Sequence, residues 1–77
     1  MLEKIFGQVL KNVREEAGIT QEALALSSEL DRTYISLLER GLRTPTITTL
    51  FKMAPSLNKT PSEIIAIVEG KINENIV

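Results

Sequence analysis

The sequence contains no cysteine and no histidine. Without cysteine the chain has neither a disulfide framework nor a thiolate, and without histidine a transition-metal site would rest on carboxylates alone. Cysteine and histidine are also common nucleophiles and general acid–base groups, so their absence removes two frequent kinds of catalytic residue. The sequence indicates neither a carboxylate pair in an evident cleft nor a glycine-rich phosphate-binding motif. We therefore expect a protein that is not an enzyme and that binds no metal or cofactor.

Long apolar runs are missing as well. No run approaches the roughly 20 residues that a membrane-spanning helix needs. The N-terminal stretch MLEKIFGQVLKNVREE is amphipathic and lacks a signal-peptide core followed by a small-residue cleavage site. We expect a cytoplasmic protein with no membrane partner, and no motif indicates a small-molecule ligand.

The composition that remains is that of one small globular domain. The 77 residues are 43% hydrophobic and 25% charged, unlike a disordered chain, and they suffice for a single core. A net charge of -1 disfavours nucleic acid as a partner, because counterion release rewards positive patches. The stretch from Arg32 to Arg43, however, holds three arginines and one acid, so positive charge is concentrated there.

Start and stop signals divide the chain into about five short helices, without the alternating pattern of strands. The first helix, about residues 2–17, has apolar residues spaced three and four apart on one face, at Ile5, Phe6, Val9, Leu10 and Val13. Gly18 ends it, because the left-handed position after a helix favours glycine.

Two short helices follow, joined by a turn of three or four residues. They span about residues 21–27 and 32–40, with Thr20 and Asp31 as N-caps, and Gly41 ends the second. This geometry matches a helix-turn-helix, although many small helical proteins contain such a pair.

The last two helices are predicted at about residues 47–57 and 61–69. Pro55 falls inside the first of these, where it has no amide proton to donate and should kink or convert the last turn. The run TPSE at residues 60–63 combines a threonine N-cap, a proline at the first helical position and the glutamate of a capping box. This run marks the start of the fifth helix.

The residues of the helix pair carry a more specific signal than its spacing. From Thr20 to Pro45 the chain reads TQEALALSSELDRTYISLLERGLRTP. It resembles the Cro/repressor-like (XRE-type) helix-turn-helix family, whose pattern is Thr-Gln-x-x-Leu-Ala, a turn, a capped helix with Ile-Ser, then Glu-Arg-Gly and a proline. The run TLFKMAPSLNKTPSEII continues the resemblance. It implies an all-α, lambda-repressor-like DNA-binding domain over residues 1–70, followed by a C-terminal tail at 71–77.

In such proteins the second helix of the motif lies in the major groove and reads base edges. The resemblance implies that the base-reading residues here are Arg32, Thr33, Ser36 and Leu37. On a helical wheel, Thr33, Ser36 and Leu37 lie opposite the apolar residues of the same helix, with Arg32 at the edge. Arg32 can donate two hydrogen bonds to guanine. The alternative for each of the four is an ordinary exposed helical residue, and Leu37 stands where the family often has a hydrogen-bonding side chain.

The resemblance also assigns residues that position the motif. It implies that Gln21 approaches a phosphate and braces the reading helix, where the alternative is an ordinary polar residue in the first turn of a helix. Arg40 and Arg43 are predicted to contact phosphates without reading sequence. The family pairs the glutamate of Glu-Arg-Gly with a basic residue of the first helix. Here the matching pair is Arg14 and Glu39, and we predict a partly buried structural bridge.

One reading helix covers only a few base pairs, so proteins of this kind gain affinity by two-fold pairing on half-sites about 34–36 Å apart. The fifth helix and the tail carry more apolar residues than one small core can use. We predict a dimer interface at Ile64, Ile67, Val68, Ile72 and Ile76. The alternative is that the tail is disordered or folds back onto its own core.

The sequence thus predicts a homodimeric, sequence-specific DNA-binding regulator of transcription, with double-stranded DNA and a second copy of itself as partners. The short chain and the run LDRTYISLLERG are similar to controller proteins of restriction–modification systems, and stand-alone regulators and phage repressors share these features. The alternative function is a protein-interaction module of the same fold, such as an antitoxin, which the net acidic charge would suit.

Overall fold

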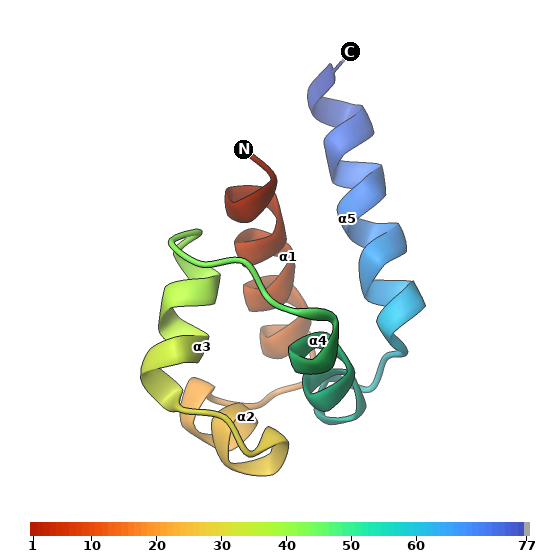
Figure 1. The fold of residues 1–77 in the computed structure, drawn as a ribbon. Coiled ribbons are helices and arrows are strands. Elements are labelled where there is room, and N and C mark those ends of the chain that lie inside the picture. Colours follow the sequence, from red (N-terminus) through yellow and green to blue (C-terminus); the bar gives the residue numbers. More distant parts are fainter. Residues whose placement is uncertain (77) are drawn as a thin grey trace.

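A computed structural model describes the backbone of residues 1–76 and the side chains of residues 1–74. Its elements are α1 (Leu2–Glu16), α2 (Gln21–Ser28), α3 (Arg32–Glu39), α4 (Ile47–Met53), a 3-10 helix η1 (Ala54–Leu57) and α5 (Pro61–Ile76) (Figure 1). No strand occurs in this described part, so the predicted all-α fold is confirmed. None of its helices is long and apolar enough to cross a membrane.

The helix ends follow the local signals of the sequence. Gly18 and Gly41 have φ angles of 74° and 75°, the left-handed region that glycine favours. The hydroxyl of Thr20 accepts a hydrogen bond from the amide of Ala23 at 3.0 Å, and Asp31 accepts one from the amide of Thr33 at 2.8 Å. These caps supply partners for the amides that the first turns of α2 and α3 leave free.

Pro55 changes the type of the helix that contains it. The α-helical geometry of α4 ends at Met53, and Ala54–Leu57 form the 3-10 helix η1. Because proline has no amide proton, it cannot continue the hydrogen-bond ladder of an α-helix. The predicted conversion of the last turn is therefore confirmed.

Helix α5 is longer than predicted. Its start is confirmed, since Glu63 accepts from the amide of Thr60 at 2.8 Å and Thr60 accepts from the amide of Glu63 at 3.1 Å. The prediction that it ends near residue 69 is wrong, because the helix continues to Ile76. Gly70 is unfavourable in a helix but does not break it, and Ile72 packs against the core beyond it. Residues 71–76 are thus part of α5 rather than a separate tail, and Val77 lies outside the described residues.

The core collects apolar side chains from every helix and from η1. Helix α1 packs against both α3 and α5, and α2 packs against α3 (Figure 1). The core residues are Phe6, Val9, Leu10, Val13, Leu24, Ala25, Ile35, Leu38, Leu50, Met53, Ala54, Leu57, Ile64 and Val68. The chain therefore uses its helices α1, α4 and α5 to hold the pair α2–α3 in place.

Candidate nucleic-acid interface

Helix α3 has one buried face and one exposed face. Ile35 and Leu38 are 0% exposed and anchor the helix in the core. Arg32 and Thr33 are exposed at its first turn, and the Asp31 cap fixes where that turn begins. The exposed face therefore starts with a guanidinium and a hydroxyl, both of which can donate hydrogen bonds to base edges.

Two further predicted base-reading residues are only partly exposed. Ser36 and Leu37 are half-buried, one turn after Arg32 and Thr33. Their accessible sides continue the exposed face of α3. The four residues thus lie together on α3, as the helical wheel indicated, and their contacts with bases stay a prediction.

The end of α3 and the loop after it present two more arginines. The amide of Leu42 donates to the carbonyl of Leu37 at 3.0 Å, and this bond closes the helix at Gly41. Arg40 and Arg43 on either side are exposed. Within the described residues neither arginine forms a salt bridge, so both guanidinium groups are available to an anion.

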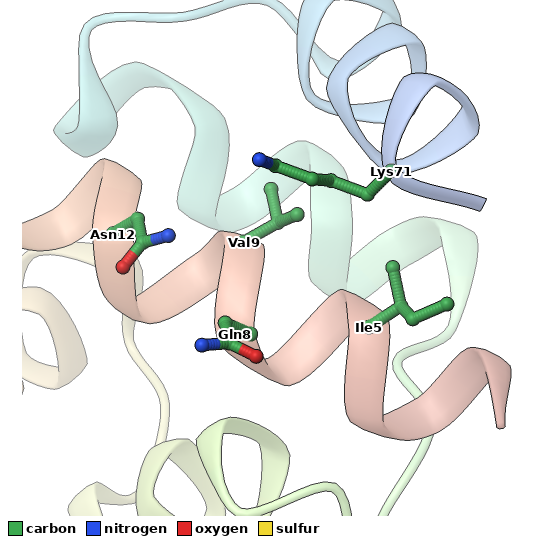
Figure 2. A pocket seen from close by; sticks show the side chains of 5 residues that line it. All are labelled: Ile5, Gln8, Val9, Asn12 and Lys71. Atoms are coloured by element: carbon green, nitrogen blue, oxygen red, sulfur yellow. The ribbon is translucent and has the colours of Figure 1, made fainter. Parts of the chain in front are cut away.

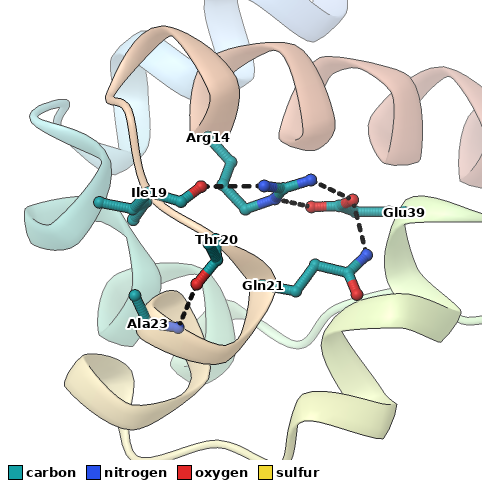
Figure 3. Close-up of polar contacts among 6 residues, drawn as sticks. All are labelled: Arg14, Ile19, Thr20, Gln21, Ala23 and Glu39. Atoms are coloured by element: carbon teal, nitrogen blue, oxygen red, sulfur yellow. Dashed lines mark hydrogen bonds and ion pairs between the residues drawn. The ribbon is translucent and has the colours of Figure 1, made fainter.

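An ion pair ties α1 to the end of α3 (Figure 3). Arg14 Nε lies 2.6 Å from Glu39 Oε2 and Arg14 Nη2 lies 3.1 Å from Glu39 Oε1, while Nη1 donates to the carbonyl of Ile19 at 2.9 Å. The Arg14 and Glu39 side chains are only 11% and 4% exposed. Hydrogen bonding to Glu39 raises the pKa of Arg14. The structure contains the pair that the sequence predicts, and the pair holds the C-terminal end of α3 against α1.

Gln21 joins this network instead of standing free at the start of α2. Its side-chain Nε2 donates to Glu39 Oε1 at 3.0 Å (Figure 3). The side chain therefore braces α2 against α3, as the resemblance implied, through a partner, Glu39, that the sequence did not identify. A phosphate contact by Gln21 would come from its backbone amide, at the N-terminus of α2, or from the second proton on Nε2.

The turn between α2 and α3 contains a backbone conformation that the sequence does not signal. Glu29 has a φ of 58°, in the left-handed region that favours glycine. The amide of Leu30 donates to the carbonyl of Ala25 at 2.8 Å, and Leu30 packs against the core. This bond fixes the turn that sets the angle between the two helices.

Gly7 is the contact point between α1 and α3 that sequence reasoning missed. A Cβ at this position would lie 2.6 Å from the carbonyl oxygen of Glu39 and would also overlap the carbonyl of Leu38. Only glycine lets the two helices approach this closely. The signal was a glycine inside an otherwise regular amphipathic helix, which often marks a close backbone approach.

The predicted dimer interface needs correction. Ile64 and Val68 are 1% and 5% exposed within this one chain, because both side chains fill the core between the helices. Ile64 therefore has almost no surface to offer a second copy, and Val68 offers only the small part that borders an apolar groove with Ile47 and Ile65. Ile67 and Ile72 are partly buried against the same core, and the side chain of Ile76 lies outside the described residues. Larger apolar exposure occurs elsewhere, at Leu2, Ile47, Phe51 and Ile65.

Chemically, the α2–α3 unit can bind a polyanion but shows no site for metal chemistry. Its exposed cations are arginines, which pair well with phosphate and with guanine. Among the residues that the structure describes, no group of three acidic side chains could hold a metal ion.

Comparison with known proteins places this geometry among transcription regulators. A family model described as "Helix-turn-helix" (HTH_3) matches residues 10–64. The control protein C.MunI from a Mycoplasma species is 38% identical over 65 residues, which cover 83% of this chain and 88% of that protein. An HTH-type transcriptional regulator of Sinorhizobium fredii, y4dJ, is 36% identical over 64 residues, or 83% of each chain. The crystal structure of the restriction–modification controller protein C.AhdI from Aeromonas hydrophila superposes with a TM-score of 0.76 at 39% identity, covering 79% of this chain and 92% of that one.

Proposed function

The chain belongs to the helix-turn-helix family, and on that premise we propose that it is a regulator of transcription that binds a two-fold symmetric DNA operator as a homodimer. The observation that carries the proposal is the exposed face of α3. It presents donors to solvent while Ile35 and Leu38 hold the helix in the core and Glu39 holds its end. A helix anchored in this way can enter the major groove as a rigid unit.

Each side chain on this face has a role that its chemistry supports. Arg32, Thr33, Ser36 and Leu37 contact base edges, with Arg32 donating to guanine and Leu37 touching a thymine methyl group. Arg40 and Arg43 bind phosphates of the same duplex, and the N-terminus of α2 at Gln21 binds another. Base contacts then set the sequence preference, and phosphate contacts set the register.

The relatives support a narrower function within this class. The protein resembles the controller proteins C.MunI and C.AhdI over most of the length of each. We place it as a controller of a restriction–modification system that binds DNA upstream of its own gene and regulates its own expression. The immunity repressor protein of Bacillus phage phi105 is 36% identical over 59 residues, which cover 77% of this chain and 41% of that protein, and this match supports the wider class of repressors.

The dimer face is best placed on the side of α4 and α5 where apolar side chains remain exposed. Ile47, Phe51 and Ile65 are 71%, 61% and 48% exposed, a large exposure for three such residues in a chain of this size. A groove beside them is lined mainly by apolar side chains, among them Leu2 and Pro45. A second copy covering this face would remove the exposed apolar surface from water, which is the main drive for association.

Sedimentation tests the dimer apart from DNA binding. The wild-type chain at tens of micromolar should sediment as a dimer, and Phe51→Glu with Ile65→Glu should sediment as a folded monomer. Wild-type protein that is only monomeric in this range would contradict the proposed dimer. A double variant that still sediments as a dimer would show that the interface does not lie on this face of α4 and α5.

The function itself is tested by footprinting on the DNA upstream of the protein's own gene. We expect a protected site made of two symmetric halves about one helical turn apart. Affinity for that site should fall steeply between about 50 and 200 mM salt, because each phosphate contact releases counterions. No protected site, together with a salt-insensitive protein partner, would favour the interaction-module function instead.

A further inference from the structure

A groove runs between α1 and the end of α3, next to the proposed reading face. One stripe of α1 lines it, and the last residues of α3 close it. The lining residues are Lys4, Gln8, Lys11, Asn12, Glu15, Glu39 and Arg40. Residues spaced three, four and seven apart lie on one face of a helix, so the side chains of α1 face the groove together.

The groove is rich in unpaired donors. Lys4, Lys11 and Arg40 are exposed, and none of them forms a salt bridge within the described residues. Of the two acids in the lining, Glu39 is already bound by Arg14, which leaves the carboxylate of Glu15 at the far end. Positive charge therefore exceeds negative charge over most of the groove.

Two amide side chains lie beside the lysines in the groove lining. Gln8 and Asn12 project from successive turns of α1, and no hydrogen bond to another described residue holds either side chain. They also border a second hollow, on the side of α5, which Ile5, Val9 and Lys71 complete (Figure 2). Lysines interleaved with amides form a set of donors typical of contacts to the sugar–phosphate backbone.

The groove is continuous with the proposed DNA-binding surface. Arg40 belongs to both, as the exposed C-cap residue that follows α3 and as part of the groove lining. The next residue, Gly41, packs directly on α1, since a Cβ there would lie 2.8 Å from Cγ of Lys4. Lys4 therefore lies beside the loop that carries Arg43, and a duplex held by Arg40 and Arg43 would pass close to it.

We propose that this groove binds the sugar–phosphate backbone of DNA that flanks the bases read by α3. At a rise of 1.5 Å per residue, Lys4 and Lys11 lie about 10 Å apart along α1. That distance corresponds to about three base-pair steps measured along the axis of the duplex. The inference rests on the proposed function and extends it, because it adds a sequence-independent contact outside the half-site.

The test compares two double variants that lose the same charge. Lys4→Gln with Lys11→Gln alters the groove, and Lys52→Gln with Lys59→Gln alters α4 and the segment after η1. Equal thermal melting curves show that both variants keep the fold. Binding to a duplex with long flanks is then measured from about 50 to 200 mM salt, on the operator and on unrelated DNA of the same length.

The groove variant should show a shallower dependence of log K on log salt, by about 0.9 for each phosphate that the variant no longer binds. Its affinity should fall by the same factor on both duplexes, so that the preference for the operator is unchanged. On an operator trimmed at the outer edge of the half-site, the wild-type protein should bind like the groove variant.

A slope equal to that of the Lys52 and Lys59 variant would overturn the inference while leaving the proposed function intact. A change confined to the preference for the operator would also overturn it, because phosphate contacts do not read sequence. Failure of the wild-type protein to prefer any operator would instead contradict the proposed function.

Discussion

Removing the carboxylate of Glu39 should destabilise the protein more than any exposed substitution. The carboxylate accepts bonds from Arg14 at 2.6 and 3.1 Å and from Gln21 at 3.0 Å, with its side chain 4% exposed. Glu39→Ala leaves the Arg14 guanidinium, 11% exposed, with a single bond to the carbonyl of Ile19. A buried charge without its partner costs about 3–5 kcal/mol.

That loss is large against the total stability of a chain of this size. At about 0.05–0.15 kcal/mol per residue the whole domain is stabilised by roughly 4–12 kcal/mol. With a shift of about 4–8 °C for each kcal/mol, the Tm of Glu39→Ala should fall by more than about 10 °C. Urea unfolding at fixed protein concentration measures the change in free energy, since dimerisation makes stability depend on concentration.

A double-mutant cycle separates the pair from its surroundings. Arg14→Met and Glu39→Leu each leave one charge buried, whereas the double variant leaves none. The double variant should therefore lose less than the sum of the two single losses, by about 1–3 kcal/mol. Glu74→Ala is the control, because its ion pair with Lys71 is exposed and should change stability by less than about 1 kcal/mol. Additive losses, or a Glu39→Ala protein that melts with the wild type, would refute the reasoning.

Four further substitutions test the local structure by thermal and urea unfolding. Gly7→Ala should destabilise the protein by about 1–3 kcal/mol, because the new Cβ would overlap backbone carbonyls of α3 that cannot move aside. At Gly70 a Cβ would have no neighbour within 4 Å, so Gly70→Ala should stabilise the protein by about 0.5–1 kcal/mol. Equal effects of the two substitutions would exclude the close approach of α1 and α3 at Gly7. Glu29→Gly should stabilise by about 1 kcal/mol, since it relieves a left-handed conformation, and a loss would contradict that. The amide of Thr60 donates to Glu63 and lowers the pKa of its carboxyl below the ordinary 4.5, so the stabilisation is present at neutral pH and lost as pH falls through the folded-state pKa. The Tm difference between wild type and Glu63→Gln should therefore shrink as pH falls from about 7 to 3, and a constant difference would count against the capping box.

The sequence predicts helices well where a side chain acts on its own backbone. Gly18 and Gly41 end their helices, and Pro55 converts its turn, because each effect depends on only a few neighbouring residues. The end of α5 was predicted too early, since a glycine at position 70 weakens a helix without stopping it. There the packing of Ile72 on the core outweighs the local preference.

In the candidate site, too, features set within one helix were predicted, and most features that depend on contacts between helices were not. The exposed face of α3 follows from helical periodicity alone, because Ile35 and Leu38 must face the core. Contacts between helices are not visible in the periodicity of either one, so the close approach at Gly7 and the role of Glu39 as the partner of Gln21 were missed. The same limit explains the error at Ile64 and Val68, where an apolar pattern could not distinguish the core from a surface between two copies.

The most direct test of the central claim, that the first turn of α3 reads bases, is the ratio of affinities for operator and unrelated DNA in Arg32→Ala, with Arg40→Ala as its matched control. Removing a bidentate contact to guanine should lower that ratio about 5- to 150-fold, equivalent to about 1–3 kcal/mol. Arg40→Ala should weaken binding to both duplexes by the same factor and leave the ratio unchanged. A ratio that Arg32→Ala does not change would contradict the claim.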